Sequence, residues 1–333
     1  MRAARYDPGM TLRIAIFLAF SSSLWASVAA AQPSFDCAKA TTAAEKAICA
    51  SPELAAADAA MNKAFAALAK SVAPDQQAAL RRDQIDWIKG RDGACFEKKD
   101  EALASCLLAE TDKRRHLLLG EGDNGAAGAP PLLPTYFREV RPKLYEITLA
   151  YPQFASPAAA KFNKAVREPI FGQNALAEHR QNTPNKFNGS SNFYQATYDI
   201  PYLSPKLASV ALQFGSYTGG AHPNNWRVGM LWDIPADKAV TPEDLLADPA
   251  KAVPAISALC KAIGEREDWG LFSDADLAAV VGDVKSWAVD RDGVTIMFDP
   301  YSVAPYVSGP HDCRLSYAEL KDWLKPGGLL PPQ

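Results

Sequence analysis

The chain has 333 residues, is 48% hydrophobic and carries a formal net charge of −3 at pH 7. Domains usually span about 100 to 200 residues, so this length predicts two of them, each with its own core. The acidic balance argues against nucleic acid or an anionic membrane surface as a partner, because both require a concentrated basic face. It permits an attraction to basic proteins.

Residues 1–31 are expected to be a signal peptide. Three arginines precede an apolar run at residues 14–28, and three alanines at residues 29–31 resemble a small-residue cleavage site. An uncleaved anchor is the alternative. The run is shorter than the roughly 20 residues of a membrane-spanning helix, and no later run reaches that length. Cleavage would leave a periplasmic or secreted chain without a membrane span, with a net charge of −5 because three arginines and one aspartate leave with the segment.

The six cysteines all follow residue 31. In the oxidising compartment that export implies, thiols pair into disulfides. The expected pairs are Cys37 with Cys49, Cys95 with Cys106, and Cys260 with Cys313. The first two pairs rest on short loop length, and a crossed pairing among those four cysteines stays open. Zinc binding is the rival interpretation, but no two cysteines have the CxxC spacing.

Residues 32–119 are rich in alanine and carry apolar residues at helical spacing, which predicts a small helical domain of three helices. Breaks at Pro74 and Gly93 separate the helices. The expected apolar faces consist of Leu54, Met61, Phe65 and Leu68, then Leu80, Ile85, Trp87 and Ile88, then Leu103, Leu107, Leu117 and Leu118.

Four charged residues, Asp83, Asp86, Arg91 and Asp92, surround Trp87 in the second of these helices. They favour a solvated helix face, since charges at helical spacing usually face water. The alternative is a charged contact surface for a basic enzyme.

Residues 120–134 contain many Gly and Pro and show no apolar period, which predicts a flexible linker. Residues 135–333 then alternate short β-branched and aromatic runs with turn residues, so we expect strands there. The runs lie at residues 144–151, 193–203, 207–217, 226–234 and 293–298, and helices are expected at 157–179, 249–267 and 273–281. The predicted fold class is α + (α+β): a small disulfide-bonded helical domain followed by an α+β domain with a largely antiparallel sheet.

Two stretches of the second domain are candidates for binding a partner. SYTGGAHPNN, residues 216–225, places a Gly-Gly turn between two strands, and FDPYSVAPYVSGP, residues 298–310, combines three prolines with two tyrosines. A rigid aromatic loop loses little entropy on binding, and tyrosine is favoured at interface centres. The expected partner-binding residues are Tyr217, Thr218, Gly219, Gly220, His222, Pro223, Asn224, Tyr301 and Tyr306. The alternatives are a structural hydrogen bond for His222 and burial of the two tyrosines in the domain's own core.

An enzyme is the minority hypothesis. The sequence contains no HExxH, GxSxG or P-loop motif. A hydrolytic metal site requires three protein ligands and an open position, which His222, His311 and Asp299 could supply if the two stretches meet in space. Nothing in the spacing requires this, so we expect no catalytic residue, no metal and no cofactor.

The first domain resembles the LprI-like family of small secreted helical domains, whose namesake is a lysozyme inhibitor. Its segments SFDCAKATTAAEKAIC, RRDQIDWIKGRDGAC and CLLAE carry the resemblance. The matching residues are Cys37, Ala44, Glu45, Cys49, Leu54, Asp58, Gln84, Trp87, Arg91, Asp92, Cys95, Cys106 and Leu107. The resemblance implies a disulfide-bonded helical module that binds lysozyme.

The second domain looks like the C-terminal domain of the anti-sigma factor RsiV, which is shared with the amino-terminal region of certain peptidoglycan deacetylases. YTGGAHPN and FDPYSVAPYVSGP followed by LSYAEL resemble its paired signatures, and YEITLAYPQF resembles the module that usually precedes it. In RsiV this domain binds lysozyme. Neither a sigma-binding segment nor a deacetylase catalytic domain is expected in this chain, so those two roles are not carried over.

The two resemblances together imply a secreted periplasmic binding protein that inhibits or captures lysozyme or a related cell-wall hydrolase. One alternative is a metal-dependent cell-wall or carbohydrate hydrolase that uses His222 and His311. Another is an envelope protein that binds peptidoglycan itself.

Overall fold

The structure is a computed structural model that describes residues 32–156, 159–172, 175–180 and 191–331. The expected signal peptide lies outside the described residues. Residues 31–333 form one compact unit. Among the described residues, no helix combines the length and the apolar character needed to cross a membrane.

Four helices make up the first part of the unit: α1 (Ala43–Ala50), α2 (Pro52–Ser71), α3 (Pro74–Ala94) and α4 (Asp100–Leu119). This is one helix more than the sequence predicted. Thr42 and Glu45 form a reciprocal capping box at the start of α1, and Ser51 ends α1 while its side chain caps α2. Disulfides Cys37–Cys49 and Cys95–Cys106 have the predicted pairing.

The apolar face predicted for α3 is partly wrong. Leu80 is fully buried, but Ile85 and Ile88 are 48% and 39% exposed. The inward face of α3 instead carries Gln84 and Arg91, both buried. Tertiary packing overrides the apolar pattern here because α3 directs its polar side chains toward α4 and the sheet.

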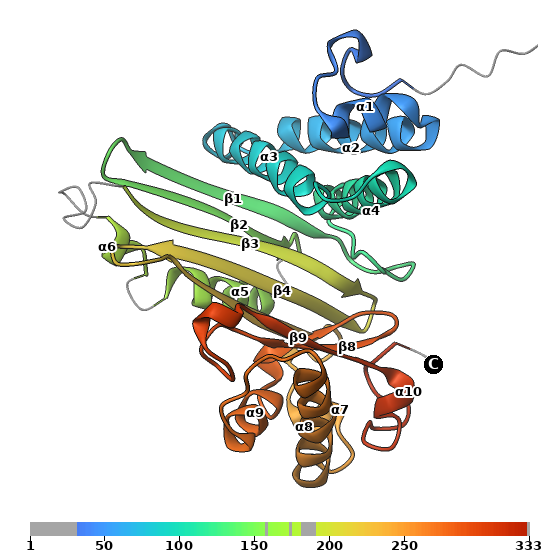
Figure 1. Ribbon diagram of the computed structural model, residues 1–333, viewed down its shortest axis with the longest axis vertical. Helices are drawn as coiled ribbons and strands as arrows, with labels where there is room; N and C mark the ends of the chain where they lie inside the picture. Colours follow the sequence, from blue (N-terminus) through green and yellow to red (C-terminus); the bar gives the residue numbers. More distant parts are fainter. Residues whose placement is uncertain (1–31, 157–158, 173–174, 181–190, 332–333) are drawn as a thin grey trace, which may run out of the picture. The chain divides into compact units, whose positions relative to one another are not determined.

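Six strands form the main sheet in sequence order: β1 (Leu132–Arg141), β2 (Tyr145–Phe154), β3 (Asn192–Leu203), β4 (Leu207–Tyr217), β5 (Asn224–Asp233) and β6 (Lys238–Ala239). All neighbours are antiparallel except β2 and β3, which confirms the largely antiparallel sheet. The parallel pair requires a crossover, which contains α5 (Ala160–Phe171) and α6 (Ala175–His179). Figure 1 shows the sheet beside the four N-terminal helices.

A second sheet of three strands contains β7 (Trp287–Val289), β8 (Gly293–Phe298) and β9 (His311–Ser316). Helices α7 (Pro242–Leu245), α8 (Pro249–Arg266), α9 (Asp274–Val281) and α10 (Tyr317–Leu320) belong to this part of the chain (Figure 1). The predicted disulfide Cys260–Cys313 joins α8 to β9. The two sheets touch at Gly229 of β5, where a Cβ atom would lie 2.1 Å from the carbonyl oxygen of Trp287. Only glycine permits that approach.

The structure corrects the expectation of a flexible linker at residues 120–134. The backbone N–H of Asp123 donates to the Ile200 carbonyl, and that of Ala126 donates to the Leu203 carbonyl. Strand β1 already begins at Leu132, whose N–H donates to the carbonyl of Gly120. The segment is therefore a turn bound to β3, because its backbone polar groups find partners there.

The helices of residues 32–119 have a small buried cluster of their own, which includes Ile48, Leu54 and Leu107, and they share a second cluster with the sheet. Leu68, Leu80 and Leu118 from the helices belong to the same buried cluster as Leu132 and Tyr136 of β1. The predicted fold class, a disulfide-bonded helical region followed by an α+β region, is confirmed. Part of the apolar surface of the helical region is buried by the sheet.

Candidate functional site

The two stretches singled out in the sequence meet in space. The imidazole of His222 stacks on the ring of Tyr306 with 3.8 Å between centroids, and the Tyr306 hydroxyl donates to the Pro223 carbonyl at 2.8 Å. Tyr301 packs against Tyr306 at 5.2 Å. We call His222, Tyr301, Tyr306 and the neighbouring Val307 the aromatic loop surface.

Several side chains of this surface are available to a partner. Val307 is 93% exposed and Tyr301 is 61% exposed. Tyr306 and His222 are half-buried against each other. The alternative that both tyrosines fill the core is therefore wrong for Tyr301. Phe272, 52% exposed, is an exposed residue that the sequence analysis missed, and its N–H donates to Val303 in the same loop.

The backbone of both loops depends on left-handed conformations. Gly219 and Gly220 have φ of 114° and 116°, which favours glycine strongly. The hydroxyl of Tyr217 closes this turn by donating to the Gly220 carbonyl. Tyr301 has φ of 69°, an uncommon value for an aromatic residue. Thr218 and Asn224 flank the turn and are exposed.

Arg227 of β5 fixes the loop between β8 and β9. Its guanidinium binds Asp299, at the start of that loop, and Asp312, just after its end. It also donates to the carbonyls of Phe298 and His311. Both ends of the loop are thus bound to one half-buried side chain, so the loop is preorganised.

The metal-binding alternative has no supporting geometry in the described residues. They contain no group of three His, Cys, Asp or Glu side chains placed to hold a metal ion. Asp299 accepts two bonds from Arg227, and the ring of His311 stacks on Trp269 at 4.6 Å. Burial lowers the pKa of His311, with Asp312 opposing that effect. His222 lies against Tyr306 instead of His311.

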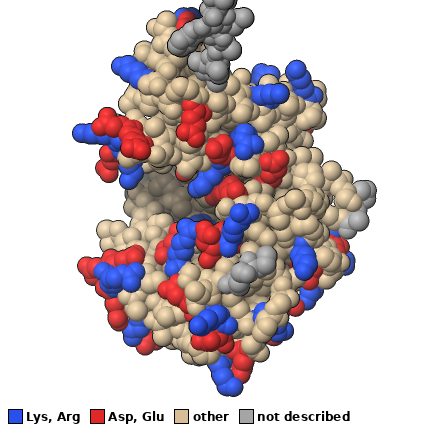
Figure 2. All heavy atoms as spheres, turned by 90° about the vertical axis from the view of Figure 1, so that its right-hand side faces the viewer, with Lys and Arg blue, Asp and Glu red and all other residues tan. Residues whose placement is uncertain are grey.

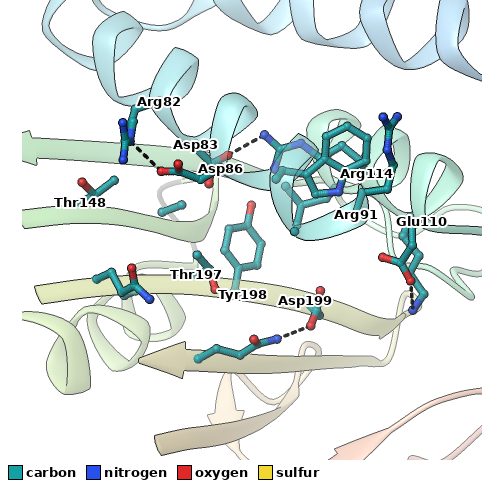
Figure 3. A pocket seen from close by; sticks show the side chains of 18 of the residues that line it. Arg82, Asp83, Asp86, Arg91, Glu110, Arg114, Thr148, Thr197, Tyr198 and Asp199 are labelled. Carbon is teal, nitrogen blue, oxygen red and sulfur yellow. Dashed lines mark hydrogen bonds and ion pairs between the residues drawn. The ribbon is translucent and has the colours of Figure 1, made fainter. Parts of the chain in front are cut away.

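A second candidate site is a cavity of about 650 Å³ between α3, α4 and strands β2 to β4, which we call the helix–sheet cleft. Its lining contains Arg82, Asp83, Asp86, Trp87, Arg91, Glu110, Lys113, Arg114, Asp123, Glu146, Thr148, Gln195, Thr197, Tyr198, Asp199 and Gln213. Figure 3 shows labelled side chains of the helices, such as Asp83 and Arg114, facing labelled side chains of the sheet, such as Tyr198. Figure 2 shows a hollow bordered by side chains of both charges on one face of the molecule.

The expectation of a solvated helix face around Trp87 is wrong for Arg91, which is buried, and for the side chain of Asp83, which is almost fully buried, and correct for Asp86, which is exposed. Arg114 of α4 binds Asp83 at 2.6 Å, and both side chains are almost fully buried. The guanidinium groups of Arg91 and Arg114 lie 5.1 Å and 5.6 Å from the Trp87 ring centroid. On this side of α3, Trp87, Arg91 and Arg114 form a largely buried cation–π network that includes the Arg114–Asp83 ion pair.

Two carboxylates of the cleft have raised pKa values. Burial, together with the nearby Asp199, raises the pKa of Asp123 to about 7. Burial also raises the pKa of Asp199, which accepts a hydrogen bond from Gln213. Asp199 is half-buried, and this desolvation disfavours its charged form. The sequence analysis missed both residues, because Asp123 lies in the presumed linker and Asp199 in a strand.

Three family models match separate parts of the chain. Residues 37–118 match the model described as lysozyme inhibitor LprI. Residues 140–225 match the model described as deacetylase PdaC, and residues 243–318 match a protein family of unknown function, DUF3298. These matches confirm the resemblances drawn from the sequence for the N-terminal and C-terminal parts.

Solved structures of the DUF3298 family are also similar to this chain. A protein from Pseudomonas aeruginosa PAO1 is 18% identical, with a TM-score of 0.44, covering 61% of this chain and 98% of its own. One from Bacteroides fragilis NCTC 9343 is 13% identical, with a TM-score of 0.43, covering 59% of this chain and 95% of its own. No curated protein matches the chain.

Proposed function

We propose that the protein is a periplasmic or secreted binding protein that captures and inhibits lysozyme or a related cell-wall hydrolase. The observation that carries the proposal is the match of residues 37–118 to the lysozyme inhibitor model. Three disulfides support an oxidising compartment, because such bonds persist in exported proteins. The acidic net charge favours association with a basic partner.

The aromatic loop surface is the proposed contact in the C-terminal part. Its tyrosines are rigid amphipathic side chains that lose little entropy on binding. Arg227 holds both ends of the loop before any partner arrives. The predicted partner-binding residues of the Gly-Gly turn, from Tyr217 to Asn224, lie next to this surface through the contact of His222 with Tyr306.

The helical part supplies a second proposed contact. Phe96 is 84% exposed and directly follows Cys95, whose disulfide to Cys106 closes the turn between α3 and α4. Ile85 and Ile88 on α3 are further exposed apolar residues. Exposed apolar side chains on a crosslinked turn are suited to a protein partner.

The test mixes the mature chain with lysozymes of several types and measures both complex formation and muramidase activity. We expect a complex and reduced activity with at least one type. Val307→Asp should weaken the complex at least tenfold, because it places a charge in the aromatic loop surface. Val140→Asp is the matched control, since it makes the same change on β1. A lack of both binding and inhibition with every lysozyme would refute the proposal.

The variant Phe96→Asp, measured in the same assay, tests how much the helical part contributes to lysozyme binding. Weaker binding with this variant alone would place the main contact on the helices. Weaker binding with Val307→Asp alone would place it on the loops.

A deacetylase activity is the second candidate, favoured by the match of residues 140–225. It requires activity on an acetylated glycan, and the described residues contain no group of three His, Cys, Asp or Glu side chains placed to hold a metal ion for it. Metal analysis of protein purified without chelator, together with the His222→Ala variant, decides this. If the purified protein contains no metal and shows no deacetylase activity, this second candidate function is excluded.

A further inference from the structure

We propose that a cavity beside the turn between β3 and β4 binds an organic anion that has an apolar body, such as an alkyl carboxylate or an alkyl phosphate. The cavity, which we call the lysine pocket, is lined by the end of β3, by this turn, by Tyr317 and Lys321 at the two ends of α10, and by residues 324–331. Figure 1 shows α10 on the side of the molecule where β3 ends. The proposal goes beyond the proposed function, because no residue of the aromatic loop surface lines this pocket.

The lysine pocket concentrates charge of one sign. Its lining contains Lys206, Lys321 and Lys325 but no aspartate or glutamate. All three lysines are exposed, and none forms an ion pair with any described residue. Hydrogen bonds to its own backbone and to Thr241 lower the pKa of Glu243, and Lys325 adds a lesser effect, but this carboxylate does not line the pocket. The three ammonium groups therefore present unpaired donors to the cavity.

The helix–sheet cleft shows how differently the same protein arranges the basic side chains of another cavity. Each of its four basic side chains forms an ion pair: Arg82 with Asp86, Arg91 with Asp92, Lys113 with Glu110, and Arg114 with Asp83. The whole chain also has a negative net charge, so its composition does not account for a cavity that contains only positive side chains. A cavity lined by one sign of charge attracts ligands of the opposite sign.

A tyrosine of the lysine pocket is an independent sign of a ligand. Tyr202 lines the pocket and is only 5% exposed, yet its hydroxyl forms no hydrogen bond with any described residue. The neighbouring Tyr317 is buried to the same degree, and its hydroxyl donates to the Asp290 carbonyl at 2.8 Å. Buried tyrosine hydroxyls usually have a partner. An oxygen of a bound anion would accept the hydrogen bond that Tyr202 does not make within the protein.

The remaining walls favour a ligand with an apolar body over a free inorganic ion. Leu324, Leu329 and Leu330 line the pocket, are half-buried, and pack against the buried cluster that contains Tyr202. The volume of about 650 Å³ lies in the range of small-molecule sites and exceeds the space that one phosphate or sulfate ion fills. An alkyl or aromatic group would cover the leucines while its acidic group lies among the lysines.

The backbone on both sides of the pocket is held in place without a ligand. The Ser204 hydroxyl accepts hydrogen bonds from the N–H groups of Lys206 and Leu207, which fixes the turn between β3 and β4. On the opposite wall, the N–H of Lys325 donates to the Leu245 carbonyl at 2.8 Å. Since the chain that carries these lysines is already ordered, binding an anion costs little backbone entropy.

The test measures binding of two anionic probes, octanoate and octyl phosphate, to the mature protein by calorimetry at pH 7 and low salt. Octan-1-ol, which has the apolar body without the charge, and acetate, which has the charge without the body, are the controls. We expect saturable binding of at least one probe, at least tenfold tighter than that of either control. High salt should weaken it, because salt screens the exposed lysines. Tighter binding of octanoate indicates a fatty-acid carboxylate, and tighter binding of octyl phosphate indicates a lipid phosphate.

Variants locate the site. The double variant Lys206→Gln/Lys321→Gln should weaken binding of the anionic probe at least tenfold. Lys46→Gln/Lys63→Gln is the matched control, because it removes the same charge from exposed positions on α1 and α2, and it should change the affinity less than threefold. Tyr202→Phe keeps the ring and removes only the hydroxyl, so it should weaken binding at least threefold. Circular dichroism and urea unfolding confirm that each variant is folded.

Unchanged binding in Lys206→Gln/Lys321→Gln would overturn the proposal, as would the absence of saturable binding at millimolar octanoate and octyl phosphate. Equally tight binding of octan-1-ol would show an apolar cavity without a preference for anions, and equally tight binding of acetate would show that the apolar wall has no role; either result overturns it. Binding to vesicles of anionic phospholipid without binding of the free probes would show a membrane-surface site instead. Because this assay contains no lysozyme, its failure leaves the muramidase test of the proposed function independent.

Discussion

Arg227 and Asp299 lie 72 residues apart in the sequence, and their side chains form an ion pair with 3.1 Å between Arg227 Nε and Asp299 Oδ1. The backbone N–H of Arg227 donates to the other oxygen of the same carboxylate. This pair joins β5 of the large sheet to the end of β8 in the small sheet. It determines where the aromatic loop surface lies.

Replacement of Arg227 by alanine should destabilise this junction. The change leaves Asp299 and two carbonyl groups without their donor, and loss of a partner from a half-buried network costs about 2 to 3 kcal/mol. Urea denaturation measures the loss, and hydrogen exchange should show faster opening of residues 299–310. Arg314→Ala is the control, because its pair with Asp290 is exposed and should contribute less than about 1 kcal/mol. Equal losses in the two variants would contradict the role given to Arg227.

Asp83→Asn should cost far more stability than Asp86→Asn, although both residues lie on α3. Asp83 pairs with the buried Arg114, so its neutralisation leaves a buried guanidinium without a counter-charge, at a cost of about 3 kcal/mol. The pair of Asp86 with Arg82 is exposed, and its loss should cost less than about 1 kcal/mol. Thermal and urea unfolding of the two variants measure the difference. A solvated face of α3 would instead produce two small and similar effects.

Removal of the disulfide between Cys260 and Cys313 should lower stability by about 4 kcal/mol. The bond closes a loop with a sequence separation of 53, and a longer closed loop restricts the unfolded chain more. The double variant Cys260→Ala/Cys313→Ala tests this in urea. Cys37→Ala/Cys49→Ala, which opens a loop of separation 12, should lose about 1 kcal/mol less on the same model. The reverse order would contradict the loop-length explanation of the stability that these two bonds contribute.

The contribution of Asp123 to stability should fall as the pH rises from about 4 to about 7. The pKa of Asp123 is raised from its ordinary value of 3.8 to about 7, so the folded protein binds more protons than the unfolded chain in that interval. The free energy of unfolding then decreases with pH and levels off above pH 7 with respect to this group. Asp199 contributes in the same direction.

Asp123→Asn should remove part of this pH dependence and stabilise the protein at pH 8, because the desolvated charge is gone. Urea unfolding between pH 5 and pH 8 measures both effects. Asp292→Asn, at an exposed position, should leave the slope unchanged. An unchanged slope in Asp123→Asn would show that its carboxyl group is not desolvated.

Short-range features of the chain could be read from the sequence. The runs at residues 207–217 and 293–298 coincide with β4 and β8, since alternation and turn residues act locally. Loop length and the division of the cysteines into two groups favoured the pairs that the structure shows, but a crossed pairing among the first four cysteines stayed open. The Gly-Gly turn was recognised because positive φ at Gly219 and Gly220 is a local requirement.

Other features depended on contacts that no local pattern contains. Ile85 and Ile88 have helical spacing yet face solvent, because the sheet and α4 accept the polar face of α3. Residues 120–131 have the composition of a linker, but backbone carbonyl groups of β3 accept hydrogen bonds from this segment. Strand β9 was missed because its sequence, HDCRLS, lacks a run of β-branched and aromatic residues, and it pairs only with β8.

The sequence by itself determined the secondary structure of most segments, the pairing of Cys260 with Cys313 and the two loops that carry glycine, proline and tyrosine, because the segments and loops depend on neighbours within a few residues and the pairing on covalent chemistry. Tertiary structure alone decided that His222 meets Tyr306, that Arg227 binds both ends of one loop, and that Asp123 lies near Asp199. Such pairings depend on strand order and on which polar groups are desolvated together, and these are properties of the folded chain as a whole.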